Sequence, residues 1–164
     1  MPSVPDIDSV GFLKMDPKPG KRAIVAPLLY FAEPQGVKNY YLIQLNEDIA
    51  IRTFSAGLLW PFSILSDEFL QPYVNGLKIS QGETPRGIEY PIYYEGAPFY
   101  VALSSLTKDG YEFYKILLQQ FKNDGGVYHP SPGSPPTNIS NGALGYFRAS
   151  AISEKKRFKI PDLH

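Results

Sequence analysis

The chain has 164 residues, a length that suits one domain and allows a buried core without a disulfide or a bound metal. Sixteen Lys and Arg balance sixteen Asp and Glu, so the chain has no general attraction for phosphate backbones, and no nucleic-acid partner is expected. Cysteine is absent, which excludes disulfides, thiolate metal ligands and a Cys nucleophile.

The residue types favour short strands over long helices. Aromatic residues make up 14% of the chain, mostly Tyr and Phe, which are strand formers. Sixteen Pro and 14 Gly interrupt the sequence too often for long helices. No apolar run approaches the roughly 20 residues of a membrane-spanning helix. The first five residues also lack the charged and apolar regions of an export signal.

The N-terminal third predicts a series of strands. Residues 7–14 and 23–31 are rich in apolar side chains and predict the first two, and Pro27 indicates a bulge or an edge position. Residues 40–45 alternate in side-chain direction and predict a third strand. Residues 49–54 then predict its hairpin partner, reached through a short polar turn.

The middle of the chain is less regular and ends in one helix. Residues 57–87 mix Trp, Pro and Gly and predict mainly loop with short strand pieces. Residues 88–94 and 99–103 predict two more strands. Residues 107–123 predict an amphipathic helix that Thr107 can cap. Its apolar stripe consists of Tyr111, Tyr114, Leu117, Leu118 and Phe121.

The C-terminal part predicts a Pro- and Ser-rich loop at 128–138 and closing strands at 143–152 and 156–160. The basic run from Lys155 to Arg157 is interpreted as a strand edge that charge protects from further pairing. About eight short strands and one helix predict a single antiparallel β-sandwich over residues 1–164, immunoglobulin- or fibronectin-like, with the helix packed against a face or an edge.

Residues for catalysis are scarce. The two histidines, His129 and His164, lie in a Pro-rich loop and at the chain end, and Ser134 lacks the strand-turn-helix setting of a nucleophile. Asp6 and Asp8 could bind Ca²⁺ only with further ligands, and no glycine-rich phosphate loop opens a helix. We therefore expect no catalytic residue, metal or cofactor, and a protein that is not an enzyme.

Aromatic side chains near loops are the remaining candidates for ligand contact. Tyr and Trp form flat contact surfaces of low entropy, which suit protein, peptide or sugar ligands. Their alternative role is to complete the core of the sandwich. The predicted contact residues are Trp60, Phe62, Tyr73, Tyr93, Tyr94 and Tyr128. In a carbohydrate-binding or glycan-active domain, Asp67 and Glu68 would be the candidate acids beside Trp60 and its neighbouring tyrosines.

Two segments of the C-terminal third carry a family resemblance. They are the helix sequence LTKDGYEFY at 106–114 and the segment PPTNISNGALGYF at 135–147. They resemble the Tyr-rich helix and the Asn-Ile-x-x-Gly-x-Leu-Gly-x-Phe signature of a domain-of-unknown-function family of Bacteroidota outer-membrane lipoproteins. Residues 1–10 are similar to that family's interdomain junction. The resemblance covers nearly the whole chain and is strongest from Leu103 onward.

The resemblance implies a cellular setting but no activity. Family members carry a lipidated Cys and an N-terminal immunoglobulin-like domain, so this chain is expected to be the C-terminal domain of a lipoprotein at the outer membrane or cell surface. Members are often encoded beside TonB-dependent receptors. The expected function is therefore non-catalytic, accessory to ligand capture or to docking on a TonB-dependent transporter. The partners are that receptor, the N-terminal domain, or a glycan or peptide ligand. A purely structural role is a further alternative.

The signature also has a structural interpretation. Glycine in a strand or turn allows conformations and close backbone approaches that other residues do not. Gly142 and Gly145 are therefore expected to serve geometry, with Leu144 and Phe147 packing inward or sideways. The signature is predicted to specify the fold and not a ligand site.

Overall fold

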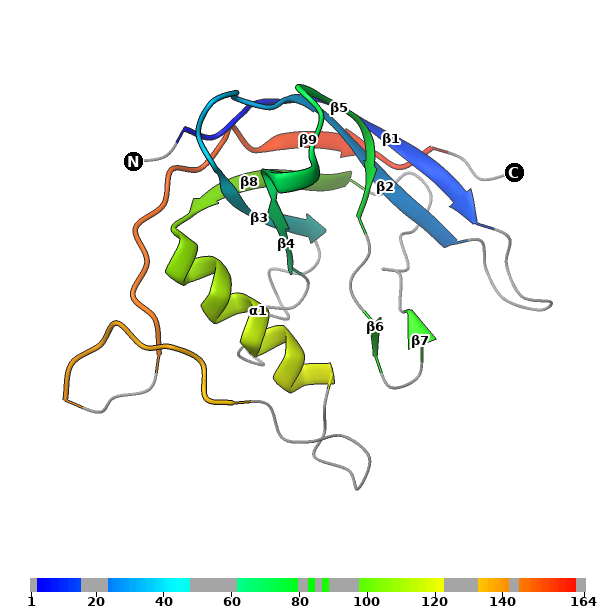
Figure 1. Cartoon of the computed structure of the whole chain (residues 1–164). Helices are drawn as coiled ribbons and strands as arrows, with labels where there is room; N and C mark the ends of the chain where they lie inside the picture. The colour runs from blue at the N-terminus through cyan, green and yellow to red at the C-terminus, as the bar shows by residue number, and fades with distance from the viewer. Residues whose placement is uncertain are drawn as a thin grey trace.

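A computed structural model shows two antiparallel sheets and one helix (Figure 1). The structure describes residues 3–15, 24–47, 62–79, 83–84, 87–88, 98–122, 133–141 and 145–161. Its elements are β1 (Ile7–Met15), β2 (Ile24–Ala32), β3 (Tyr40–Glu47), β4 (Phe62–Ser66), the short 3₁₀ helix η2 (Asp67–Phe69), β5 (Tyr73–Lys78), β6 (Glu83–Thr84), β7 (Gly87–Ile88), β8 (Pro98–Leu106), α1 (Lys108–Lys122) and β9 (Lys156–Lys159).

The strand order is that of a fibronectin type III sandwich. One sheet has the order β1-β2-β5 and the other β4-β3-β8-β9, while β6 and β7 form a separate hairpin. Lettered along the chain without that hairpin, the sheets read A-B-E and C′-C-F-G. The predicted mainly β sandwich with one helix is confirmed. The basic run at the C-terminus forms β9, which is an edge strand as interpreted from its charge.

The core lies between the two sheets, because successive strand residues point to opposite faces. From the three-stranded sheet, Leu29 and Phe31 are fully buried in it, and they meet Ile43 and Leu103 of the four-stranded sheet. The Phe31 and Tyr41 rings meet edge to face with centroids 6.5 Å apart. Edge-to-face aromatic pairs of this kind stabilise the packing between the two layers.

Helix α1 covers the other face of the four-stranded sheet, so the molecule has three layers (Figure 1). Leu42 and Leu106 point to this side and pack with Tyr114, which is also buried. The helix begins as predicted: the Thr107 hydroxyl accepts a hydrogen bond from the Gly110 backbone N–H at 3.1 Å. The predicted stripe packs on the sheet through its members Tyr111, Tyr114, Leu117 and Leu118.

The prediction of mainly loop over residues 57–87 is wrong for the described part of that region. It contributes β4 to one sheet and β5 to the other, and the turn η2 joins them. Gly76 in β5 has a positive φ of 80°, and the register between β2 and β5 shifts nearby. A bulged strand that contains Asn and Gly carries a weak sequence signal, because these residue types otherwise favour turns.

The predicted strand over residues 143–152 is also wrong. Of its described part, only Ile152 forms an isolated bridge, with Ser104. The segment still follows the edge of β8, since Ser105 N–H donates to the Ala151 carbonyl and Ser153 N–H to the Leu103 carbonyl. Phe147, expected to pack, has 76% of its surface exposed. Serine hydroxyls bond to backbone N–H groups along this edge and replace part of a regular ladder.

Pro27 lies in a central strand and not at a sheet edge. Its carbonyl accepts from Ile79 N–H just beyond the end of β5, so the missing proline N–H falls where the pairing with β5 stops.

The predicted hairpin partner at residues 49–54 lies outside the described residues. Both sides of β3 over residues 40–44 are already paired, with β4 and β8. No helix in the described part of the chain combines the length and apolar character needed to cross a membrane.

Candidate binding pocket

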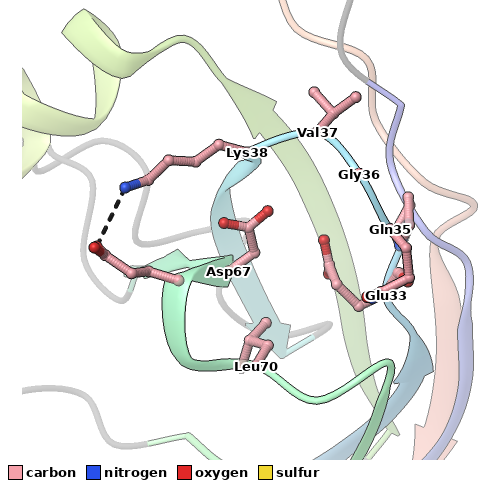
Figure 2. Close-up of a pocket in the computed structure, with 9 residues that line it drawn as sticks. Glu33, Gln35, Gly36, Val37, Lys38, Asp67 and Leu70 are labelled. Carbon is pink, nitrogen blue, oxygen red and sulfur yellow. Dashed lines mark hydrogen bonds and ion pairs between the residues drawn. The ribbon is translucent and has the colours of Figure 1, made fainter.

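An open pocket of about 330 Å³ lies at one end of the sandwich, between the β2–β3 connection and the turn after β4 (Figure 2). Its lining residues are Glu33, Pro34, Gln35, Gly36, Val37, Lys38, Asp67, Glu68 and Leu70. In related sandwiches the B–C connection at this end belongs to the variable binding loops. The pocket therefore occupies a place where this architecture commonly carries recognition.

Backbone hydrogen bonds fix the two segments that form the pocket. Glu33 N–H donates to the Pro72 carbonyl at 2.9 Å, and Asp67 N–H donates to the Asn39 carbonyl at 3.2 Å. Between these anchors the chain turns at Gly36, whose φ of +87° favours glycine. The sequence Glu-Pro-Gln-Gly at residues 33–36 predicts a turn, because Pro and Gly are typical turn residues, and the structure shows that this turn forms one wall of the pocket.

Glu33 is the most unusual side chain of the pocket, because a carboxyl group is rarely buried without a cationic partner. Only 6% of its surface is exposed. Its Oε1 accepts from the Tyr41 hydroxyl at 2.7 Å and from Asn39 Nδ2 at 3.1 Å. Its Oε2 is buried without a hydrogen-bond partner among the described residues, as is Asn39 Oδ1. Acceptor capacity therefore remains unused beneath the pocket.

Burial raises the pKa of the Glu33 carboxyl above its ordinary value, because desolvation disfavours the charged form. The hydrogen bonds from Tyr41 and Asn39 oppose this change, and the nearby charge of Asp67 adds to it. The same desolvation and the bond to Glu33 raise the pKa of the Tyr41 hydroxyl, which stays protonated and donates. Glu33 and Asp67 thus form an acidic pair. None of the groups that act on the Glu33 carboxyl is basic.

Asp67 comes from the opposite wall, at the start of η2. Its Oδ2 accepts the Asn39 backbone N–H at 2.5 Å, which ties η2 to the entrance of β3. In Figure 2 the Asp67 and Glu33 carboxylates both lie in the space beneath the segment that carries Val37 and Lys38. Two separate elements therefore present negative charge to one cavity.

A salt bridge lies at the rim of the pocket. Lys38 Nζ is 3.3 Å from Glu68 Oε2, and each side chain has about half of its surface exposed (Figure 2). The hydrogen bond to Glu68 raises the pKa of the Lys38 ammonium. An exposed pair of this kind contributes little to stability and opens easily. Lys38 pairs with Glu68 and also interacts electrostatically with Asp67. Glu33 has no cationic partner among the groups that act on it.

Exposed apolar side chains lie beside the acidic pocket. Val37 on its rim is 67% exposed, and Phe69, which precedes the lining residue Leu70, is 87% exposed. Tyr73 at the start of β5 is 48% exposed, but it lies on the outer face of the three-stranded sheet, because its neighbour Val74 points into the core. The Tyr73 hydroxyl shares a hydrogen bond with Asp8. Large apolar side chains that gather beside a cavity are typical of contact surfaces.

Of the aromatic residues predicted for contact, none that the structure describes is among the residues that line this pocket. Tyr73 lies on the outer face of the three-stranded sheet beside Asp8. Phe62 begins β4, but the side chain of Phe62 is outside what the structure describes. Trp60, Tyr93, Tyr94 and Tyr128 lie outside the described residues, and so do His129 and His164. Asp67 faces the pocket, whereas Glu68 pairs with Lys38. The carbohydrate hypothesis that used these residues stays a prediction.

Sequence reasoning missed Glu33 as a site residue. The Glu-Pro-x-Gly pattern predicted only a turn, and the partners of Glu33 follow six and eight residues later, in Asn39 and Tyr41. A buried polar residue can be recognised only when its surroundings are known. Within the described residues, no group of three or more His, Cys, Asp or Glu could hold a metal ion, so the acidic pair is not part of such a cluster.

Comparison with known proteins gives a family but no function. No curated protein and no solved structure matches the chain. A family model described as a domain of unknown function matches residues 1–156, which confirms the resemblance found in the sequence at that level. By this match over nearly its whole length, the chain belongs to the family of domains of unknown function DUF4249.

Proposed function

We propose that this chain is a non-catalytic binding domain of a cell-surface lipoprotein of the outer membrane, where it supports ligand capture or docks on a TonB-dependent transporter. The observation that carries the proposal is the surface formed by the acidic pocket and two exposed apolar side chains, Val37 and Phe69. We call it the pocket surface. It combines an open cavity, two acidic side chains that face it and apolar area at one end of a sandwich.

The fold supports a role in binding because paired strands hold the two short connections that carry the pocket surface. The pocket surface lies on two short connections, and the strands that flank them are held by ladders in two different sheets. A rigid scaffold that presents short connections at one end is a common arrangement for recognition. The cellular setting comes from the resemblance of the helix and signature segments, and it is part of the proposal.

Co-purification from the native host tests the proposal. The full-length protein would carry an affinity tag, be crosslinked in intact cells and be isolated from detergent-solubilised membranes. We expect it in the outer-membrane fraction, together with a TonB-dependent barrel identified by mass spectrometry. Recovery in the soluble fraction without a lipid anchor would contradict the location. A barrel that is never recovered after crosslinking would contradict the docking.

Surface variants locate the contact. Val37→Ser and Phe69→Ser remove exposed apolar groups, so they should leave folding unchanged and reduce recovery of the barrel. Ile152→Ser is the matched control, because Ile152 is 61% exposed but lies on the segment along β8, away from the pocket-lining residues. Equal loss of recovery in all three variants would show that the pocket surface is not the contact.

A carbohydrate ligand is the second candidate, favoured by Tyr73 and by the two acids that face the cavity. Screening the purified domain against a glycan array tests it. Binding that Tyr73→Ala abolishes would favour this function over protein docking. Without bound glycans, the carbohydrate alternative would be rejected.

A further inference from the structure

We infer that the pocket between Glu33 and Asp67 receives the positively charged side chain of an arginine or lysine from a partner protein. This inference rests on the proposed binding function and names the chemistry of the partner. The acidic pair is the first observation. The second is the burial of the Glu33 side chain, whose Oε2 has no hydrogen-bond partner in the described part of the molecule.

An uncompensated buried carboxylate favours a cationic ligand. Removing a charge from water is costly unless the charge is paired or hydrogen-bonded. Glu33 has two hydrogen bonds, both at Oε1, and the charge that acts on it is the like charge of Asp67. A guanidinium or ammonium group in the pocket would supply the missing opposite charge to both carboxylates. Binding would then relieve a cost that already exists in the free protein.

The shape of the site favours a long basic side chain over a metal ion. Hard cations such as Ca²⁺ take six or more oxygen ligands in roughly fixed geometry. The described residues offer no group of three acidic or His side chains at one point, and Asp67 Oδ2 is already bonded to Asn39 N–H. A cavity of about 330 Å³ is also much larger than one ion needs. It has room for the planar guanidinium and part of its aliphatic stem.

The rim favours a cation that belongs to a protein. Val37 and Leu70 line the cavity with apolar surface that the methylene stem of Arg or Lys would cover. Phe69, which precedes Leu70 in the chain, is 87% exposed and would meet neighbouring apolar residues of a partner segment. A free small cation would leave this apolar area unused.

The salt bridge at the rim allows a second test, in which a substitution should strengthen binding and not weaken it. Lys38 neutralises Glu68 and places a positive charge beside the cavity, where it would repel an entering cation. Removing that charge should therefore strengthen binding, whereas removing the charge of Glu33 or Asp67 should weaken it. A purely structural role for these side chains would not give effects of opposite sign.

Titration of the purified domain with capped peptides, followed by the backbone amide signals in NMR spectra, tests the inference. The probe is the acetylated and amidated tripeptide Leu-Arg-Leu, with Leu-Lys-Leu beside it. Its matched control contains citrulline, which keeps the shape of arginine without the charge. We expect saturable shifts at Gly36, Lys38 and Glu68, and an affinity about 10-fold or more tighter for the arginine peptide than for the citrulline peptide.

Isosteric variants assign the effect to the pocket. Glu33→Gln and Asp67→Asn should each weaken the arginine peptide about 10-fold, and Lys38→Gln should strengthen it. Glu112→Gln is the control, since it removes one exposed acid that pairs with Lys115 on helix α1. Amide spectra of each variant without peptide show whether it is folded.

Three outcomes would overturn the inference. The citrulline peptide could bind as well as the arginine peptide, the control Glu112→Gln could weaken binding as much as Glu33→Gln, or Ca²⁺ alone could cause the same shifts and displace the peptide. These results are separate from the proposed function. A barrel that still co-purifies while the arginine peptide fails would leave docking in place and reject the cationic side chain. The reverse result would support the pocket chemistry and reject the transporter.

Discussion

The side-chain amide of Asn138 pairs with both backbone groups of Phe147. Asn138 Nδ2 donates to the Phe147 carbonyl at 2.7 Å, and Phe147 N–H donates to Asn138 Oδ1 at 2.7 Å. The first and last residues of the Asn-Ile-x-x-Gly-x-Leu-Gly-x-Phe signature are thus held together as one residue pair of a sheet would be. Gly145 lies within this closed loop with a φ of +143°, against Ile139. Gly145 serves local geometry, as predicted, whereas Gly142 lies outside the described residues.

Replacing Asn138 should open this loop. Asn138→Ala removes both hydrogen bonds, so the free energy of unfolding should fall by about 1–2 kcal/mol. Asn138→Asp keeps the acceptor but loses the donor, so its free energy of unfolding should lie between that of the parent and that of Asn138→Ala. Urea denaturation measures the change, with Ser140→Ala as the control at an exposed neighbouring position. A change for Asn138→Ala no larger than that of the control would contradict the structural role.

Gly110 is expected to tolerate Ala poorly, although Ala normally stabilises a helix by about 1 kcal/mol relative to Gly. A Cβ at this position would lie 3.2 Å from Thr107 Oγ1 and 3.4 Å from Tyr146 Cε1. The Thr107 hydroxyl cannot easily move, since it bonds to the Gly110 N–H and lies 3.0 Å from the Tyr146 hydroxyl. Gly110→Ala should therefore lower the midpoint of thermal unfolding.

A second background separates crowding from helix propensity at this position. Tyr146→Ala removes the neighbouring ring, so the penalty of Gly110→Ala should shrink or change sign in the double variant. An equal penalty in both backgrounds would show that Tyr146 does not cause it.

Glu33 should make stability depend on pH. Its pKa is raised in the folded state above the ordinary value of 4.5, so below that value the carboxyl is neutral in both states and carries no cost. As the pH rises from 4.5 through the raised pKa, ionisation of the buried carboxyl destabilises the folded state, and the free energy of unfolding falls. Glu33→Gln should remove the loss and gain stability at neutral pH relative to the parent. Urea midpoints between about pH 4 and pH 8 measure it; a difference that does not grow with pH would contradict the burial.

The destabilisation caused by Tyr41→Phe should depend on pH, because the Tyr41 hydroxyl donates to the Glu33 carboxyl. The variant removes the hydroxyl that donates to Glu33 Oε1 and leaves the ring that packs against Phe31. We expect a loss of about 1–3 kcal/mol at a pH well above the raised pKa of Glu33, where the carboxyl is charged. The loss should be smaller near pH 4, where the carboxyl is neutral. In the Glu33→Gln background the loss at that higher pH should also be smaller; an equal loss there would show that the hydroxyl does not act through Glu33.

Local pattern was enough to predict the regular elements. The alternation over residues 40–45 predicted β3, because a strand between two packed layers needs apolar residues on both faces: Ile43 faces the other sheet and Leu42 faces the helix. The stripe and the Thr107 cap predicted α1 because both depend on residues three or four positions apart. The predicted bounds of 107–123 and the observed Lys108–Lys122 agree closely.

Local pattern failed where long-range contacts hold the chain. The strand β5 contains Asn75 and Gly76, whose propensities favour a turn, and it is held by its pairing with β2. Residues 145–152 have alternating apolar side chains but follow β8 through bonds of Ser105 and Ser153, which no periodicity reveals.

The amino-acid sequence by itself determined the mainly β class, the single helix with its cap, and the turn at Glu33 to Gly36, because each depends on neighbours close along the chain. Only the tertiary structure decided that Glu33 is buried and faces a cavity with Asp67. These two residues are far apart in the sequence and come from connections at the same end of two sheets. Burial and the pairing of charges depend on distance in space, and the order of residues along the chain does not state that distance.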